Sequence, residues 1–110
     1  MRIISGTAGG IPIHVPKKIT RPTTDRVRES LFSSLGNIVA GARVLDLFAG
    51  SGALGLECLS RGATSVDFVD ESREACQSIR RNLEKAKLDG GRVHQRKVFA
   101  FLEGISPTRP

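Results

Sequence analysis

The sequence predicts an α/β fold of the doubly wound, Rossmann-like type, in which helices cover a parallel β-sheet. Two observations carry this prediction. From residue 43 onward, short apolar runs alternate with stretches of helical period in the order βαβαβ. A glycine-rich turn, of the kind that joins a strand to a ligand-binding helix, follows the first apolar run. The chain therefore predicts about three parallel strands, the first half of such a sheet.

An N-terminal extension over residues 1–36 is predicted ahead of the sheet. Apolar and polar side chains alternate within residues 1–16 on both sides of a glycine cluster, and this period of two favours a β-hairpin. Because proline cannot donate to a β-ladder, Pro12 and Pro16 confine the second arm of the hairpin to an edge.

A linker and a helix complete the extension. Residues 17–22 are basic and end in proline, which is typical of a linker. Thr23 or Thr24 can cap the helix that follows, since a threonine oxygen accepts hydrogen bonds from the free N–H groups of a first turn. Apolar residues recur on one face of this helix until Gly36 ends it.

Residues 37–105 are predicted to form the sheet unit, and the tail 106–110, which ends at Pro110, is predicted to be unstructured. The predicted elements are a strand over 44–48, a helix over 53–60, a strand over 65–69, a helix with Ala75, Ile79, Leu83 and Ala86 on one face, a strand over 92–96, and an apolar piece over 98–102. In the strand order 3-2-1-4-5 the first strand is central, so three strands alone leave it as an uncovered edge. We expect such a chain to be marginally stable or to self-associate.

The composition is that of one soluble domain, with 110 residues of which 39% are hydrophobic and 25% charged. Cys58 and Cys76 fall in helical runs without a C-x-x-C spacing, and the sequence has no signal peptide or long apolar stretch. These features predict a reduced, cytoplasmic protein with no membrane segment and no metal site.

The net charge of +6 favours a polyanionic partner such as RNA. The basic residues form two clusters, the first of Arg2, Lys17, Lys18, Arg21, Arg26 and Arg28 and the second of Arg80, Arg81, Lys85, Lys87, Arg92, Arg96 and Lys97. Judged on charge alone, solvated surfaces explain these clusters equally well. The sequence contains no Tyr or Trp, so stacking on single-stranded bases is not indicated.

Three glycines in the turn after the first strand match the pattern G-x-G-x-x-G: Gly50, Gly52 and Gly55. The match is meaningful because the turn follows a strand and opens a helix, where backbone can approach a ligand closely. Asp70 stands twenty residues beyond Gly50, at the end of the second strand. A carboxylate at this spacing accepts hydrogen bonds from a ribose, so we predict a ligand that contains adenosine.

Asp46 decides which ligand is expected. A dinucleotide would place its pyrophosphate at the start of the helix, where a carboxylate in the first strand would repel it. S-adenosylmethionine (SAM) has no phosphate and carries a sulfonium and an ammonium group, so the same carboxylate would attract it. The alternatives are structural: Asp46 could cap the following loop, and Asp70 could cap the helix after Glu71.

Two blocks together resemble a known family: Arg21-Pro-Thr-Thr-Asp-Arg-Val-Arg-Glu29 and Leu45-Asp-Leu-Phe-Ala-Gly-Ser-Gly-Ala-Leu-Gly-Leu-Glu57. They are similar to the bacterial 16S ribosomal RNA guanine-N2 methyltransferases, and the similarity extends from about Arg2 to Leu102. The resemblance implies an enzyme that transfers a methyl group from SAM to the N2 of a guanine in small-subunit ribosomal RNA.

The resemblance also implies site residues. The turn from Asp46 to Gly52 would wrap the methionine part of SAM, Asp70 would hold the ribose hydroxyls, and the block from Arg21 to Glu29 would close over the cofactor. The implied cofactor-binding residues are Thr23, Thr24, Asp46, Phe48, Ala49, Gly50, Ser51, Gly52, Asp70, Glu71 and Val98. The implied RNA-facing residues are Arg2, Lys17, Lys18, Arg21, Arg26 and Arg28.

The sequence departs from the family pattern at two places. Lys97 stands where relatives carry an acidic or amide residue near the adenine, at the end of the third strand. Residues 9–12 replace a basic cluster of the N-terminal hairpin.

A third difference concerns catalysis. The Asn/Asp-Pro-Pro-aromatic segment, which orients the guanine amine in this family, does not occur in these 110 residues, and we expect it beyond Pro110. Because methyl transfer depends on that orientation, we expect the chain alone to be inactive, with no catalytic residue of its own.

Two other functions are considered. A non-catalytic module could bind RNA through the two basic clusters without responding to SAM. An NAD(P)-dependent oxidoreductase fragment would share the glycine motif, but Asp46 disfavours it.

Overall fold

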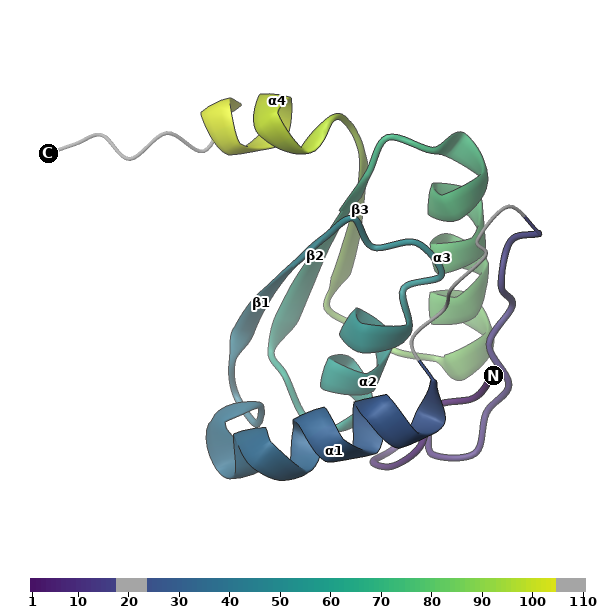
Figure 1. Ribbon diagram of the computed structural model, residues 1–110, viewed down its shortest axis with the longest axis vertical. Coiled ribbons are helices and arrows are strands. Elements are labelled where there is room, and N and C mark those ends of the chain that lie inside the picture. The colour runs from purple at the N-terminus through teal and green to yellow at the C-terminus, as the bar shows by residue number, and fades with distance from the viewer. Residues whose placement is uncertain (18–23, 105–110) are drawn as a thin grey trace, which may run out of the picture.

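The computed structural model describes residues 1–17 and 24–104 and confirms the α/β class (Figure 1). The elements are α1 (Asp25–Leu35), a 3-10 turn η1 (Gly36–Ile38), β1 (Arg43–Leu47), α2 (Ala53–Ser60), β2 (Ser65–Asp70), α3 (Arg73–Ala86), β3 (Gly91–Gln95) and α4 (Val98–Gly104). The strands form one parallel sheet in the order β1-β2-β3. The carboxyl ends of all three strands therefore meet at one edge of the sheet.

Two of the predicted segments fall largely or wholly outside the described residues. They are the linker over 17–22, of which only Lys17 is described, and the tail 106–110, which ends at Pro110. Both stay predictions.

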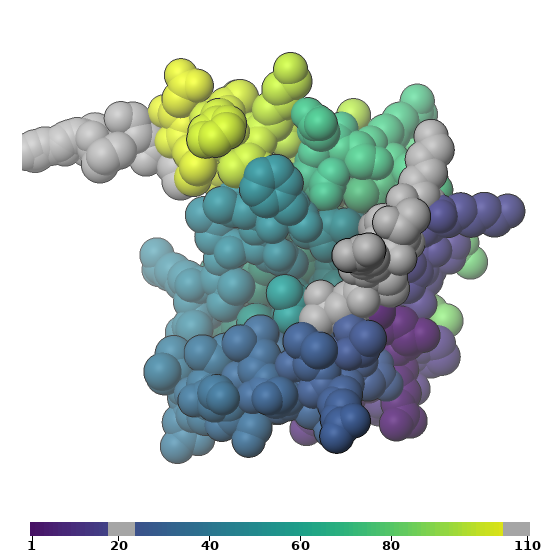
Figure 2. Space-filling model, viewed as in Figure 1, coloured from purple at the N-terminus to yellow at the C-terminus, as the bar shows by residue number. Residues whose placement is uncertain are grey.

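The two faces of the sheet are covered differently (Figure 1). Because side chains alternate along a strand, Val66 and Phe68 of β2 point into a core shared with α2 and α3. Val69 points to the opposite face and packs with Val98 and Phe101 of α4 in a second, smaller cluster. α4 and α1 lie at opposite ends of the molecule (Figure 2).

Glycine allows α2 to pack tightly on the sheet. A Cβ atom on Gly55 would lie 2.3 Å from the Phe68 ring, and one on Gly52 would lie 3.0 Å from Ile79 of α3. Gly52 also has a φ of +83°, a conformation that favours glycine. These two glycines of the motif therefore have a packing role in addition to any contact with a ligand.

The predicted N-terminal hairpin is present in a short, irregular form, with one antiparallel bridge between Arg2 and Pro12. The Ile3 N–H donates to the Ile11 carbonyl at 2.9 Å, and the Ile13 N–H donates to the Met1 carbonyl at 2.9 Å. Pro12 and Pro16 supply no N–H groups for a longer ladder. The extension also bonds to helices: the backbone N–H of Ala8 donates to Ser60 Oγ at 2.9 Å, and the N–H of Thr7 donates to the Ser60 carbonyl at 2.8 Å. The predicted cap of the next helix is confirmed for Thr24, whose Oγ1 accepts from Val27 N at 3.3 Å.

β1 occupies an edge of the sheet, as the strand order required. Leu45 of β1 is 42% exposed, and Phe48 just beyond the strand is 76% exposed. An exposed apolar edge offers unpaired backbone groups to a second chain. We therefore expect the protein to self-associate through β1, with a sedimentation coefficient that rises with protein concentration.

A charge at the edge tests this expectation. Leu45→Lys should lower the concentration dependence, because an exposed lysine on an edge strand opposes pairing. Leu31→Lys, on the exposed side of α1, serves as the matched control and should leave self-association unchanged. A wild-type chain that sediments as a monomer at every concentration contradicts the prediction.

Candidate functional site

The loop 48–52 follows β1 at the carboxyl ends of the strands, and three of its residues have positive φ angles. Phe48, Gly50 and Gly52 have φ angles of 55°, 59° and 83°. The Ala49 N–H donates to the Val69 carbonyl of β2 at 3.0 Å, and the Gly52 N–H donates back to the Ala49 carbonyl at 2.8 Å. The loop is thereby folded against the end of β2, with Ser51 buried and Phe48 exposed.

Asp70 joins this loop to the one that precedes α3. Its Oδ2 accepts from the Gly50 N–H at 3.0 Å, and its Oδ1 accepts from the Ser72 N–H at 2.9 Å. The cap of α3 is Ser72, whose Oγ accepts from Ala75 N at 3.2 Å. Asp70 therefore bridges two loops at the carboxyl ends of the strands and does not itself cap the helix.

Asp46 of β1 reaches the first turn of α2, where its Oδ2 accepts from the Gly55 N–H at 3.2 Å. This is the capping contact that the structural alternative for Asp46 required. The pKa of Asp46 is raised to about 6, chiefly by burial; the hydrogen bond from Gly55 opposes the change, and the nearby charge of Asp70 adds to it. Two carboxylates on neighbouring strands thus accept from N–H groups just before and within the first turn of α2.

Three N–H groups around the start of α2 are bound by side-chain oxygens of the chain itself. Asp70 accepts from Gly50, Asp46 accepts from Gly55, and Ser51 Oγ accepts from the Ala53 N–H at 3.3 Å. A pyrophosphate would have to displace these acceptors and approach two carboxylates. The site is therefore acidic and fits a cationic, phosphate-free adenosine derivative better than a dinucleotide.

The other implied cofactor-binding residues differ in their position and exposure. Glu71 is exposed next to Asp70, whereas the side chain of Val98 is buried in the cluster beneath α4. Thr24 lies at the start of α1, where its hydroxyl is used in the helix cap. Thr23 lies outside the described residues.

The Asn/Asp-Pro-Pro-aromatic segment that the family resemblance implies does not occur in the 110 residues, so the position of the catalytic residues stays a prediction.

β3 ends at Gln95 and not at Lys97, which corrects the expected position of the strand end. Gln95 pairs in register with Asp70, so the strand end carries an amide residue beside the ribose-binding candidate. Lys97 is exposed and directly precedes α4.

Only some of the candidate RNA-facing residues are shown to be exposed. Arg2, Lys17 and Arg26 are exposed, while Lys18 and Arg21 lie outside the described residues. Arg28 is fully buried, so its assignment to an RNA surface is wrong. Its Nη2 donates to Asp25 Oδ1 at 2.5 Å and to the Arg2 carbonyl at 2.6 Å.

Glu57 of α2 is the buried partner of Arg28, and sequence analysis missed its role. Its Oε1 accepts from Arg28 Nη1 at 3.3 Å and from the Ile4 N–H at 2.9 Å. Its Oε2 accepts from Arg61 Nε at 2.8 Å and from the Ser5 N–H at 3.1 Å. A glutamate in an otherwise apolar helix, followed four residues later by arginine, was the available signal.

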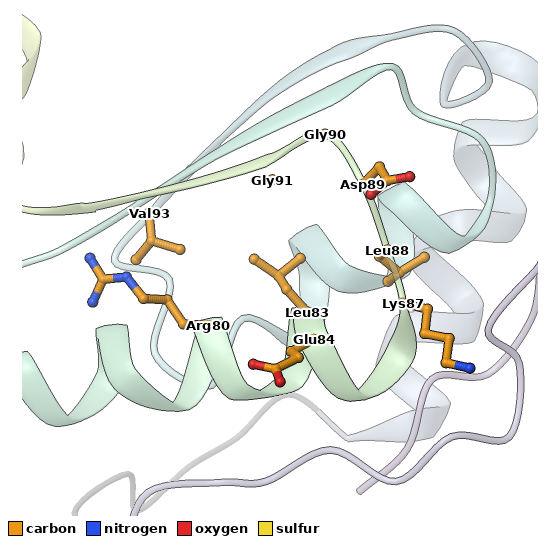
Figure 3. Close-up of a pocket in the computed structure, with 9 residues that line it drawn as sticks. All are labelled: Arg80, Leu83, Glu84, Lys87, Leu88, Asp89, Gly90, Gly91 and Val93. Atoms are coloured by element: carbon orange, nitrogen blue, oxygen red, sulfur yellow. The ribbon is translucent and has the colours of Figure 1, made fainter.

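An open hollow of about 630 Å³ lies between α3 and β3 at the opposite end of the sheet (Figure 3). Gly90 and Gly91 line it together with Arg80, Lys87, Glu84 and Asp89, so its charges are mixed. It shares no residue with the loop 48–52. Among the described residues, no group of three or more His, Cys, Asp or Glu side chains could hold a metal ion. No helix within these residues is long and apolar enough to cross a membrane.

The sequence matches a known family and several known proteins over most of its length. The family model described as "Conserved hypothetical protein 95" matches residues 1–106. "Putative rRNA methyltransferase YlbH" of Bacillus subtilis is 48% identical over 89 residues, which are 80% of this chain and 48% of that protein. "Ribosomal RNA small subunit methyltransferase D" of Escherichia coli is 44% identical over 103 residues, which are 93% of this chain and 52% of that protein. The chain thus spans about half the length of these relatives.

Solved structures of proteins named as putative methyltransferases superpose on this chain. "Putative methyltransferase yhhF" from Escherichia coli superposes with a TM-score of 0.84 at 40% identity, over 92% of this chain and 55% of that one. "SMU.776, a putative methyltransferase complexed with SAH" superposes with a TM-score of 0.61 at 25% identity, over 72% of this chain and 20% of that one.

Proposed function

Since the chain belongs to the family described as "Conserved hypothetical protein 95", we propose that it is the cofactor-binding part of a SAM-dependent methyltransferase that acts on ribosomal RNA. The two curated relatives named above carry rRNA methyltransferase or ribosomal RNA methyltransferase in their names. At the finer level, we propose the N2 of a guanine in small-subunit ribosomal RNA as the methyl acceptor, on the strength of the two sequence blocks.

One observation supports SAM over a dinucleotide above all others. Asp46 and Asp70 occupy the N–H groups around the start of α2 that a pyrophosphate would need. The chemistry that SAM supplies is a methyl group on a sulfonium, whose positive charge complements the two carboxylates. In the proposed arrangement Asp70 accepts from the ribose hydroxyls, and the backbone of Gly50 to Gly52 contacts the methionine part.

Isothermal titration tests the cofactor. We expect SAM and S-adenosylhomocysteine to bind with one site per chain and NADH to show no heat of binding. Binding of NADH in preference to SAM contradicts the proposal. Enhancement of the intrinsic fluorescence of NADH on mixing with the protein provides an independent measurement of the same alternative.

Ribosomal RNA is the proposed partner, and the exposed cations of the extension support it. Arg26 and Lys17 are exposed, and their charges would replace counterions on phosphates. In the full enzyme the guanine would be extruded from its stack before methylation.

We expect Arg26→Ala to weaken RNA binding and to reduce the slope of log affinity against log salt by about 1. Arg43→Ala, an exposed arginine at the start of β1 that belongs to neither basic cluster, is the matched control and should change neither quantity. Fluorescence anisotropy with a labelled 16S fragment at several salt concentrations measures both. An Arg26→Ala protein with an unchanged slope contradicts the prediction, and RNA binding without any response to SAM would favour the non-catalytic module.

A further inference from the structure

Asn82 of α3 is a buried amide whose hydrogen bonds are all made to backbone. Its side chain is 2% exposed. Oδ1 accepts from the His14 N–H at 2.7 Å. Nδ2 donates to the His14 carbonyl at 2.9 Å and to the Ser51 carbonyl at 3.2 Å. One side chain therefore pairs with both backbone groups of His14 and with the loop 48–52.

These contacts join three segments that are distant in the sequence. Ser51 belongs to the loop that Asp70 also holds, on the proposed SAM-binding edge. His14 lies three residues before Lys17, which begins the basic linker. Figure 1 shows the N-terminal segment running beside α3, which agrees with the paired contacts at His14.

The same arrangement places His14 beside Arg81, a residue of the second basic cluster. A small hollow of about 150 Å³ is lined by His14 and by Glu74, Gln77, Ser78 and Arg81 of α3. The extension therefore lies against the helix that carries Arg80, Arg81 and Lys85. Any movement of the extension at His14 would change both this surface and the Asn82 contacts.

The chemistry at this position requires a carboxamide of this length. A carboxylate lacks the donors that the His14 and Ser51 carbonyls need, and an apolar side chain satisfies none of the three backbone groups. Burying an unpaired carbonyl or N–H is unfavourable, so loss of the amide would loosen the loop and the extension together.

We propose that Asn82 is a positioning residue that couples SAM binding at the loop 48–52 to the docking of the RNA-facing extension. The inference rests on the proposed function. Because coupling between two sites is reciprocal, SAM should order the extension, and a docked extension should tighten SAM binding. Asn82 itself need not touch the cofactor.

Two measurements on the 110-residue chain test the coupling. The first compares Asn82→Leu, which keeps a similar volume without hydrogen bonds, with Asn37→Leu in the exposed turn η1. We expect Asn82→Leu to weaken SAM binding by roughly tenfold or more in isothermal titration, within the range usual for coupled sites. The Asn37→Leu control should bind like the wild type.

The second measurement needs no variant, so it decides the question if Asn82→Leu fails to fold. In the wild type, SAM should slow hydrogen exchange at the His14 amide, which Asn82 binds. The Thr64 amide, which donates to the Ala42 carbonyl at the amino ends of the strands and outside the extension, is the internal control. Global stabilisation by SAM would slow exchange at both amides alike, whereas the coupling slows exchange at His14 more than at Thr64.

The outcomes separate the two claims. SAM binding to the wild type without any change at His14, and with Asn82→Leu binding as tightly, overturns the coupling and leaves the proposed function standing. A wild type that does not bind SAM overturns both.

Discussion

Replacing Glu57 by glutamine is expected to lower the free energy of unfolding by about 3–5 kcal/mol, the usual cost of removing one partner from a buried ion pair. Glu57 is fully buried, and it accepts hydrogen bonds from the two arginines Arg28 and Arg61. The neutral amide would leave the guanidinium of Arg28, which is also fully buried, with less compensating charge.

The effect should be large because Glu57 holds three parts of the chain together. It binds the segment before α1 through the Ile4 and Ser5 N–H groups, α1 through Arg28, and the end of its own helix through Arg61. Arg61 in turn lies over the ring of Phe32 of α1, 4.6 Å from its centroid. A loss of this size is a large fraction of the stability of a small domain.

Urea unfolding followed by circular dichroism measures the change. Glu29→Gln in α1 is the matched control, because Glu29 is exposed and such surface substitutions usually change stability by less than about 0.5 kcal/mol. Equal unfolding midpoints for the two variants would show that the buried network does not stabilise the fold as described.

Replacing Asp46 by asparagine is expected to weaken SAM binding and at the same time to stabilise the folded chain near pH 8. Asparagine keeps an oxygen that can accept from Gly55 N but carries no charge to attract the sulfonium. We expect at least a roughly tenfold loss of affinity, since one charged contact in a partly buried site contributes on the order of 1.5–3 kcal/mol.

The stability change follows from the pKa of Asp46, which folding raises from 3.8 to about 6. The folded chain binds the proton more tightly than the unfolded chain, so this group favours folding below pH 3.8 and loses that contribution as the pH rises through about 6. At about 1.36 kcal/mol per pKa unit, the ionised carboxylate destabilises the fold by on the order of 2–3 kcal/mol above that range.

Thermal melts at two pH values measure the stability change. Asp46→Asn should melt at a higher temperature than the wild type at about pH 8, and the difference should disappear toward about pH 4. Asp89→Asn, an exposed residue before β3, is the matched control and should melt like the wild type at both. Unchanged melting together with unchanged SAM binding would remove Asp46 from the site.

SAM binding to the wild type should follow the same ionisation. A cation binds the deprotonated carboxylate more tightly, so affinity should rise as the pH increases through about 6. An affinity that is flat across this range would mean that the sulfonium or ammonium group does not lie near Asp46.

Much of the fold could be predicted because it follows from local patterns. Alternating or continuous apolar residues predicted the bounds of β1, β2 and β3 to within one or two residues of those observed. The helical period of α3 predicted the buried face that carries Ala75, Ile79 and Ala86. The turn 48–52 and Asp70 come together because parallel strands end at one edge. Each of these signals lies within one element or in the spacing between neighbouring elements.

The tertiary structure alone decided which polar residues are buried. Arg28 belongs to a basic run and gave no local sign that it would pair with Glu57, 29 residues away. Asn82 had no local partner, because its hydrogen bonds are to His14 and Ser51, 68 and 31 residues away. Periodicity reports which face of an element is apolar, whereas the burial of a charge or an amide depends on long-range contacts, so only the assembled fold could show these residues.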